Sequence, residues 1–118
     1  MPSFVVLEHD SPTGLHWDFM LEMGPALATW SLPRPPDSAQ PMTARALPDH
    51  RMAFLEYEGP ISGDRGSVGR WDRGTYGVEH QSDTELVVLL RGGKLAGRAA
   101  LERTPDTPQT WRYSFAPE

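Results

Sequence analysis

The side chains from Leu15 to Glu22 fall into two sets that alternate along the chain, and this pattern limits the folds that the chain can adopt. The two alternating sets of side chains are Leu15, Trp17, Phe19 and Leu21 on one side and His16, Asp18, Met20 and Glu22 on the other. This alternation is typical of a β-strand with one face against the core and the other toward solvent. We therefore expect a half-buried strand with an apolar face and a polar face that carries the chemistry.

Segments of similar β-forming character recur between Gly and Pro residues that mark turns. The predicted strands cover residues 3–9, 15–22, 26–32, 53–57, 67–73, 75–80, 84–91, 94–103 and 109–115. Met42 to Leu47 is compatible with either a short strand or a single helical turn. Four prolines between Pro33 and Pro41 predict a loop. Gly92-Gly93 predicts a two-residue hairpin turn with positive φ at both glycines.

Eight or nine short strands, with no helical periodicity longer than a couple of turns, indicate a mainly β fold. We expect a single-domain small antiparallel β-barrel with short helical turns at most. The last predicted strand, residues 109–115, is expected to pair with the free edge of the first, residues 3–9. The length of 118 residues predicts one domain that covers residues 1–118.

Composition narrows the possible function classes. The chain has no cysteine, which excludes disulfides and thiolate zinc sites and fits a reducing, cytoplasmic setting. No segment approaches the roughly 20 apolar residues that span a bilayer, so we expect no membrane association. The net charge of -5 argues against a protein that coats DNA without sequence preference. Between Arg34 and Arg73, however, six arginines balance six acids, so all the surplus negative charge lies outside this window.

Histidine and aspartate side chains suggest a metal site near the start of the chain. His16 and Asp18 are two positions apart on one predicted strand, so their side chains project to the same side and could share a divalent cation. His9 ends the preceding strand, and the turn from Asp10 to Gly14 could bring it alongside. Two imidazoles and one carboxylate leave open positions, as in catalytic metal sites. The same residues also occur on strands as ordinary solvated side chains.

Seven short motifs follow one another between residues 4 and 76. They are Phe4-Val5-Val6, His9-Asp10, Leu15-His16-Trp17-Asp18-Phe19, Trp30-Ser31-Leu32-Pro33, Asp49-His50, Tyr57-Glu58-Gly59 and Trp71-Asp72-Arg73-Gly74-Thr75. This ordered set resembles the 3′-phosphoesterase domain of bacterial DNA ligase D and its stand-alone relatives. Seven ordered motifs are far more specific than the metal triad by itself.

The resemblance implies a compact β-barrel with a divalent metal, Mn²⁺, that acts on nucleic-acid 3′ ends in DNA end repair. The implied reaction removes a 3′-phosphate or a 3′-terminal ribonucleotide. By the same resemblance, His9, His16 and Asp18 are metal ligands, while His50 contacts the scissile phosphate and Arg34 binds phosphate. The implied partners are nucleic-acid 3′ ends and a DNA ligase or end-joining protein acting in trans.

The chain departs from this family at two positions. Met20 stands where the family has an arginine that holds phosphate, and Phe54 stands where it has a tyrosine. Neither side chain can donate a hydrogen bond. The interval between His9 and His16 is also one residue longer than usual. Four arginines are candidates to replace the lost one: Arg45, Arg51, Arg65 and Arg70.

Two alternatives therefore accompany the phosphoesterase hypothesis. The first is a catalytically weak or inactive barrel that binds DNA ends or a repair partner. The second is a small iron oxygenase, in which His16, Asp18 and His50 form a two-histidine, one-carboxylate triad and His9 is free. The role of His9 distinguishes the oxygenase from the phosphoesterase.

Overall fold

The computed structural model describes all residues from 1 to 118 and contains nine strands and one short 3₁₀-helix. The elements are β1 (Ser3–Ser11), β2 (Gly14–Met23), β3 (Ala26–Leu32), β4 (Met42–Arg51), the 3₁₀-helix η1 (Met52–Leu55), β5 (Gly59–Pro60), β6 (Ser67–Gln81), β7 (Glu85–Gly92), β8 (Ala96–Arg103) and β9 (Thr110–Pro117). The fold is therefore mainly β, as the alternating pattern predicts. The structure contains no helix with the length and apolar character needed to cross a bilayer.

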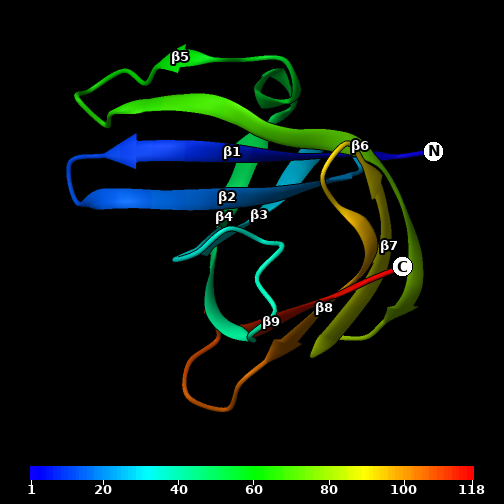
Figure 1. Cartoon of the computed structure of the whole chain (residues 1–118). Coiled ribbons are helices and arrows are strands. Elements are labelled where there is room, and N and C mark those ends of the chain that lie inside the picture. Colours follow the sequence, from blue (N-terminus) through cyan, green and yellow to red (C-terminus); the bar gives the residue numbers. More distant parts are fainter.

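All paired strands are antiparallel, and the pairing returns to its starting strand. The order is β1-β2-β3-β4-β9-β8-β7-β6-β5, and β6 also pairs with β1. Figure 1 shows β1, β2 and the first half of β6 side by side, with β7, β8 and β9 in the other part of the molecule. The expected pairing of the first strand with the last is wrong, because β9 lies between β4 and β8.

The long strand β6 explains this difference. The prediction of two strands, 67–73 and 75–80, is wrong, since Gly74 continues a single strand of 15 residues. A Cβ atom at Gly74 would lie 2.0 Å from the carbonyl oxygen of Arg91, so this glycine permits close approach to β7 and does not break the strand. The first part of β6 pairs with β1 and the second part with β7.

The structure also tests three further predictions of local secondary structure. Residues 42–47 belong to strand β4, whereas the expected strand at 53–57 is wrong because residues 52–55 form η1. The hairpin between β7 and β8 exists, but β7 ends at Gly92 and β8 begins at Ala96, so three residues connect the strands. Neither Gly92 nor Gly93 has a positive φ, which contradicts the expected turn type.

A carboxylate from another strand explains the conformation of this hairpin. Asp72 on β6 is 6% exposed and accepts hydrogen bonds from the backbone N–H groups of Gly93, Lys94 and Leu95, at 2.9, 3.0 and 2.8 Å. A charged acceptor that satisfies three donors fixes a turn more firmly than the turn residues alone can. The connection is therefore set by a tertiary contact that the local sequence does not reveal.

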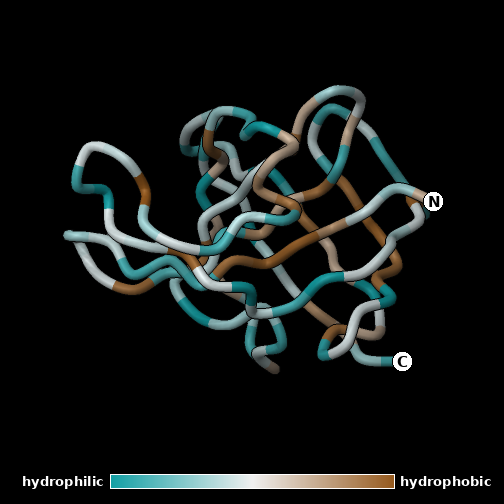
Figure 2. The backbone as a smooth tube through the Cα atoms, turned by 90° about the horizontal axis from the view of Figure 1, so that it is seen from above, coloured by the Kyte–Doolittle hydropathy of each residue, from teal (hydrophilic) through white to brown (hydrophobic).

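Both faces of β2 are buried, because the apolar residues form two clusters. The larger has 16 buried residues and includes Phe19 and Leu21, and the smaller consists of Val5, Leu7, Met20, Leu27 and Val68. Residues of η1 pack against the smaller cluster. The expected solvent-facing side of β2 is thus wrong, since Met20 and Asp18 are only 1% and 3% exposed. Figure 2 shows hydrophobic stretches crossing the middle of the molecule and hydrophilic stretches mainly in outlying loops.

We predict that Asp72→Ala lowers the free energy of unfolding by about 3 kcal/mol, since it leaves three backbone donors without their acceptor. Urea denaturation followed by circular dichroism measures this change. Asp83→Ala is the matched control, because Asp83 is exposed and should change stability by no more than about 0.5 kcal/mol. Equal losses in the two variants would contradict the role assigned to Asp72.

Candidate metal centre

The register of the β1–β2 hairpin brings the two histidines together. His9 and His16 are directly opposite each other, and the rings lie 4.5 Å apart between centroids. Asp18 follows His16 by two positions, so its side chain projects from the same face. Ser11 pairs with Gly14 across the end of the hairpin, so the longer interval between the histidines is absorbed in the turn without displacing His9.

The ligand atoms of these three residues converge. The distances are 3.1 Å from His9 Nδ1 to Asp18 Oδ2 and 3.0 Å from His16 Nε2 to Asp18 Oδ1, and all three ligand atoms lie within 4.8 Å of one another. Ligand atoms about 2.1 Å from one cation are roughly 3 Å apart when they occupy adjacent positions. The observed separations therefore fit a shared divalent cation.

Hydrogen bonding in the site also fits a cation. His9 Nε2 lies 2.8 Å from the carbonyl oxygen of Arg65, so it donates its proton there and, in the neutral ring, leaves the Nδ1 lone pair facing Asp18. Asp18 Oδ1 is buried and has no hydrogen bond of good geometry, although His16 Nε2 is near. The Nδ1 lone pair of neutral His9 lies 3.1 Å from Asp18 Oδ2, and two electron-rich atoms at this distance are unfavourable unless a positive charge lies between them.

The electrostatic environment acts most clearly on His16. The Asp18 carboxylate, whose Oδ1 lies 3.0 Å from His16 Nε2, raises the pKa of the His16 imidazole above its ordinary value. Partial burial opposes the shift because it disfavours the charged ring. A metal ion bound at this nitrogen would compete with a proton there, so its binding would depend on pH.

His50 lies in the same cleft as the cluster. The cleft has a volume of about 380 Å³ and is lined by His9 and Asp18, by His50 at the end of β4, and by an apolar floor that includes Met20. His50 Nδ1 donates to the carbonyl oxygen of Pro48 at 3.0 Å, which leaves Nε2 available. The Phe54 ring, also in the cleft, packs edge-on against His50 at 5.5 Å between centroids.

The structure places Arg34 away from this cleft. Arg34 follows β3 in an exposed loop and donates to the carbonyl oxygen of Pro41 at 2.8 Å. Its neighbour Pro33 lines a separate shallow hollow that also includes His16 and Arg45. Arg34 itself lines neither this hollow nor the cleft, while His50 is in the cleft beside His9 and Asp18.

Of the four arginines considered as replacements, two line the cleft. Arg51 ends β4, and Arg65 lies in the loop before β6. Neither forms an ion pair, although Arg65 Nε donates to the carbonyl oxygen of Ser62 at 2.7 Å. Arg70 differs because Glu56 lies 3.8 Å away and partly neutralises it. The sequence identifies these arginines as candidates, but only the fold separates them.

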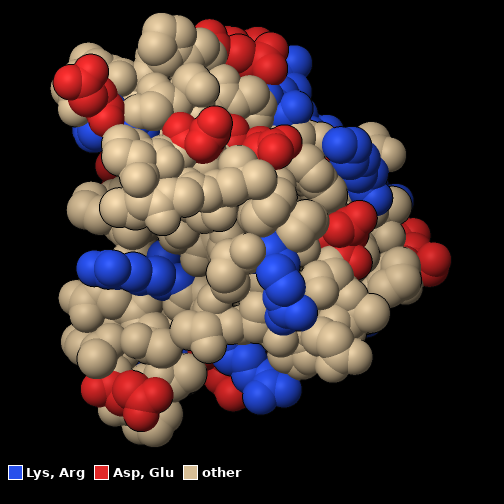
Figure 3. All heavy atoms as spheres, turned by 60° about the vertical axis from the view of Figure 1, so that its left-hand side comes forward, with Lys and Arg blue, Asp and Glu red and all other residues tan.

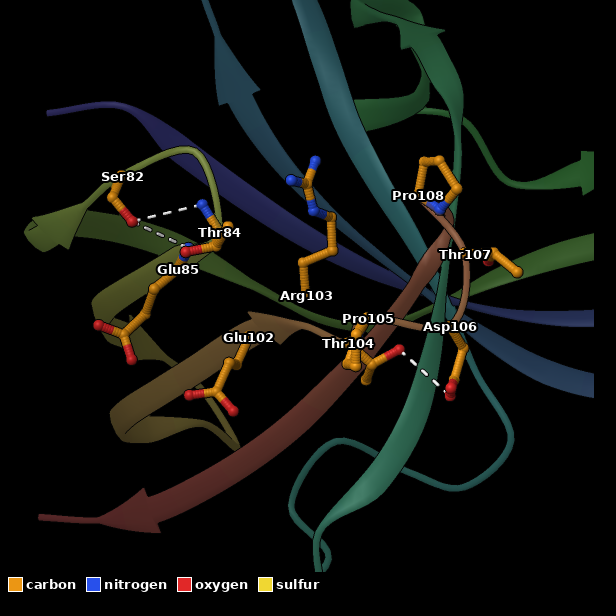
Figure 4. A pocket seen from close by; sticks show the side chains of 10 residues that line it. All are labelled: Ser82, Thr84, Glu85, Glu102, Arg103, Thr104, Pro105, Asp106, Thr107 and Pro108. Atoms are coloured by element: carbon orange, nitrogen blue, oxygen red, sulfur yellow. Dashed lines mark hydrogen bonds between the residues drawn. The ribbon is translucent and has the colours of Figure 1, made fainter.

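A larger hollow at the other end of the sheet has unsuitable chemistry for a phosphate. Its volume is about 680 Å³, and no hydrophobic side chain lines it. Figure 4 shows the carboxylates of Glu85, Glu102 and Asp106 around it, with Arg103 as the basic residue. Three negative charges against one positive charge repel an anionic group, so the smaller cleft is the better candidate.

These features define a class: a small, mainly β, antiparallel protein that carries a two-histidine, one-carboxylate cluster beside a cleft with basic residues. The family model described as "DNA Ligase D 3'-phosphoesterase domain" matches residues 7–103. The chain belongs to this family, and the resemblance read from the seven motifs is confirmed.

Several curated relatives are longer proteins with the same type of name. The chain is 34% identical over 111 residues to the "Multifunctional non-homologous end joining DNA repair protein LigD" of Mycobacterium tuberculosis H37Rv, an alignment that covers 86% of this chain and 14% of that protein. For the Pseudomonas aeruginosa PAO1 "Multifunctional non-homologous end joining protein LigD", the identity is 34% over 111 residues, with 86% and 13% covered. The Mycolicibacterium smegmatis protein is 32% identical over 117 residues, with 86% and 15% covered. The chain thus spans about one seventh of these relatives.

We predict that His16→Ala weakens binding of a divalent cation by roughly a hundredfold or more, because it removes one of three converging ligands. Isothermal titration with Mn²⁺ as the probe measures this affinity. His80→Ala is the control, since His80 lies on β6 and pairs with Glu85 at 3.1 Å, outside the cluster. Equal Mn²⁺ affinity in wild type and His16→Ala would remove His16 from the site.

A second prediction concerns the backbone that supports His9. Gly66 has φ +89°, and a Cβ atom there would lie 1.9 Å from the carbonyl oxygen of Asp10. Gly66→Ala must therefore shift the loop whose Arg65 carbonyl holds the His9 ring. Loss of such an outer contact typically lowers metal affinity about 10-fold to 100-fold, and the same titration should show this.

Gly77→Ala is the matched control for this loop, because a Cβ atom at Gly77 meets nothing within 4 Å. It should leave Mn²⁺ affinity at the wild-type value. If Gly66→Ala also binds Mn²⁺ as the wild type does, the Arg65 carbonyl has no part in orienting His9.

Proposed function

We propose that the protein is a metal-dependent phosphoesterase that acts on nucleic-acid 3′ ends and removes a 3′-phosphate or a 3′-terminal ribonucleotide in DNA end repair. One observation carries the proposal: the ligand atoms of His9, His16 and Asp18 converge within 4.8 Å at a cleft that also contains His50. Membership of the DNA ligase D 3′-phosphoesterase domain family supports the reaction class.

In this proposal, His9, His16 and Asp18 hold the divalent cation, which we take to be Mn²⁺. When bound, such a cation polarises a phosphoryl oxygen and activates a water molecule. His50 contributes its free Nε2 to the phosphoryl oxygens and stabilises the negative charge that develops there. Arg34 binds phosphate, for which its guanidinium must leave the carbonyl oxygen of Pro41.

The positive charge missing at position 20 comes from other elements in this proposal. Met20 belongs to the apolar floor and is 1% exposed, so it offers no contact to an anion. Arg51 and Arg65 line the same cleft without an ion-pair partner, which makes their charges available to a phosphate. Arginine presents donors in a planar fork that matches two phosphate oxygens.

A weakly catalytic or inactive protein that binds DNA ends or a repair partner is the second candidate. The observations that favour it are Met20 and Phe54, which replace the expected arginine and tyrosine. Loss of one charged contact in a dry site typically slows a reaction about a hundredfold or more. The oxygenase alternative is less well supported, because the convergent cluster contains His9 and not His50.

The proposal also includes the domain organisation, the fold, the partner and the location of the protein. We place residues 1–118 in one domain with a small antiparallel β-barrel fold, which the return of strand pairing from β6 to β1 supports. A DNA ligase or end-joining protein is the proposed partner in trans, since the relatives carry names from non-homologous end joining. The cytoplasm is the proposed location.

We predict that the protein, supplied with Mn²⁺, releases inorganic phosphate from a primer-template with a 3′-phosphate and leaves a 3′-hydroxyl. Asp18→Asn should lower the rate at least about a hundredfold, because it keeps the shape but removes the negative charge from the buried ligand. Gel analysis of a 5′-labelled primer and a phosphate assay both measure the product.

His80→Ala is the control for this assay and should retain the wild-type rate. If wild-type protein at saturating Mn²⁺ forms no 3′-hydroxyl product, although it still binds the metal and the strand, the second candidate replaces the first.

A further inference from the structure

A second hollow adjoins the proposed metal cleft. It has a volume of about 250 Å³ and shares four lining residues with the cleft. These shared residues are Arg51, Phe54, Ile61 and Arg65. The hollow then continues past them to Tyr57 and Pro60, with Ala53 at its side. A group bound at the metal therefore has a direct continuation into this space.

The lining of the second hollow suits a flat aromatic group. Phe54 and Tyr57 pack edge-on at 5.9 Å between centroids, and Phe54 packs in the same way against His50. The Tyr57 hydroxyl donates to the carbonyl oxygen of Pro60, so the ring is held in place. Tyr57 is nevertheless 37% exposed, although its ring is large and mostly apolar. Aromatic rings that are fixed but exposed are stacking surfaces for nucleobases.

The charge of the hollow points to an anionic ligand. Arg51 and Arg65 are its only charged lining residues, so the space has two positive charges and no acid. Figure 3 shows Lys and Arg side chains separated from one another on the face where the β1–β2 hairpin ends, without a continuous basic surface. Arg51 and Arg65 thus give the second hollow a local positive charge, while the face in Figure 3 has no broad basic surface for coating nucleic acid.

We propose that the second hollow binds the base of the 3′-terminal nucleotide, while Arg51 and Arg65 contact the phosphates on either side of its sugar. This inference rests on the proposed function, because it places the reacting 3′-phosphate at the metal cleft. The volume is slightly below the range of about 300–1,000 Å³ for drug-sized ligands, so the hollow holds one base and not a run of nucleotides.

The proposal restricts the class of substrate. A base in this hollow is out of the double-helical stack, and removing a base from a duplex costs a few kcal/mol. The site therefore favours 3′ ends whose terminal nucleotide is single-stranded or mismatched. A blunt, fully paired end binds less well, because its terminal base pair must first open.

Binding of short DNA strands that end in a 3′-hydroxyl tests the base contact without turnover. One fluorescein-labelled tetranucleotide carries a normal terminal base, and the other carries an abasic tetrahydrofuran residue at that position. We expect the Mn²⁺-loaded wild-type protein to bind the first about tenfold more tightly in fluorescence anisotropy, as stacking on one base predicts. Equal affinity for the two strands would overturn the proposal.

Ala53→Phe provides the matching variant, because Ala53 is exposed and lines the second hollow but not the metal cleft. It should reduce affinity for the base-bearing strand to that of the abasic strand and leave Mn²⁺ binding unchanged. Ala39→Phe, at an exposed position in the loop after β3, is the control and should behave as the wild type. An unchanged preference for the base in Ala53→Phe would overturn the proposal.

The phosphate contact is tested with Arg51→Ala. This variant should bind both strands more weakly, and the slope of log affinity against log salt concentration should become smaller by about one. Arg112→Ala on β9 is the control. An unchanged salt slope in Arg51→Ala would remove Arg51 from the phosphate contacts.

If base-dependent binding is present but a 3′-phosphate strand yields no 3′-hydroxyl, the proposed reaction fails while the base subsite stands.

Discussion

The site depends on the fact that β1 is hydrogen-bonded on both of its edges. On one side, β2 places His16 opposite His9, and on the other side β6 places Val68 opposite the same residue. The pairing with β6 fixes the end of the preceding loop, whose Arg65 carbonyl accepts the His9 proton. Because both edges are occupied, the backbone of His9 cannot shift without disturbing a strand ladder.

Burial of the second face of β2 gives the cluster its electrostatic strength. η1 packs over the apolar group around Met20 and Leu27, and Asp18, two positions before Met20 on β2, is also buried. A carboxylate that is 3% exposed interacts with nearby charges much more strongly than a solvated one, since less water screens it. The same burial makes an isolated charge costly, so Asp18 needs a positive partner, either a protonated histidine or a cation.

The local sequence pattern was sufficient to predict the strand nearest the candidate metal site. The alternation in residues 15–22 predicted β2, and the spacing of His16 and Asp18 predicted that the two side chains share a face. The single long strand β6 could not be predicted, because a glycine at position 74 suggests a break, whereas in the fold it permits close contact with Arg91 of β7. The Arg65 carbonyl, a backbone group from a distant loop, also leaves no signal in the sequence.

In the proposed function, the positive charge expected at position 20 is carried by other elements of the fold. An arginine in place of Met20 would project from a strand into the small apolar cluster, where burial of an unpaired charge is costly. Arg51 and Arg65 instead lie at the wall between the metal cleft and the second hollow, beside Phe54. Charge at this wall can act on the phosphate and on the nucleotide that carries it. In the proposed function, the position of Arg51 and Arg65 at this wall couples binding of the phosphate to recognition of the terminal base.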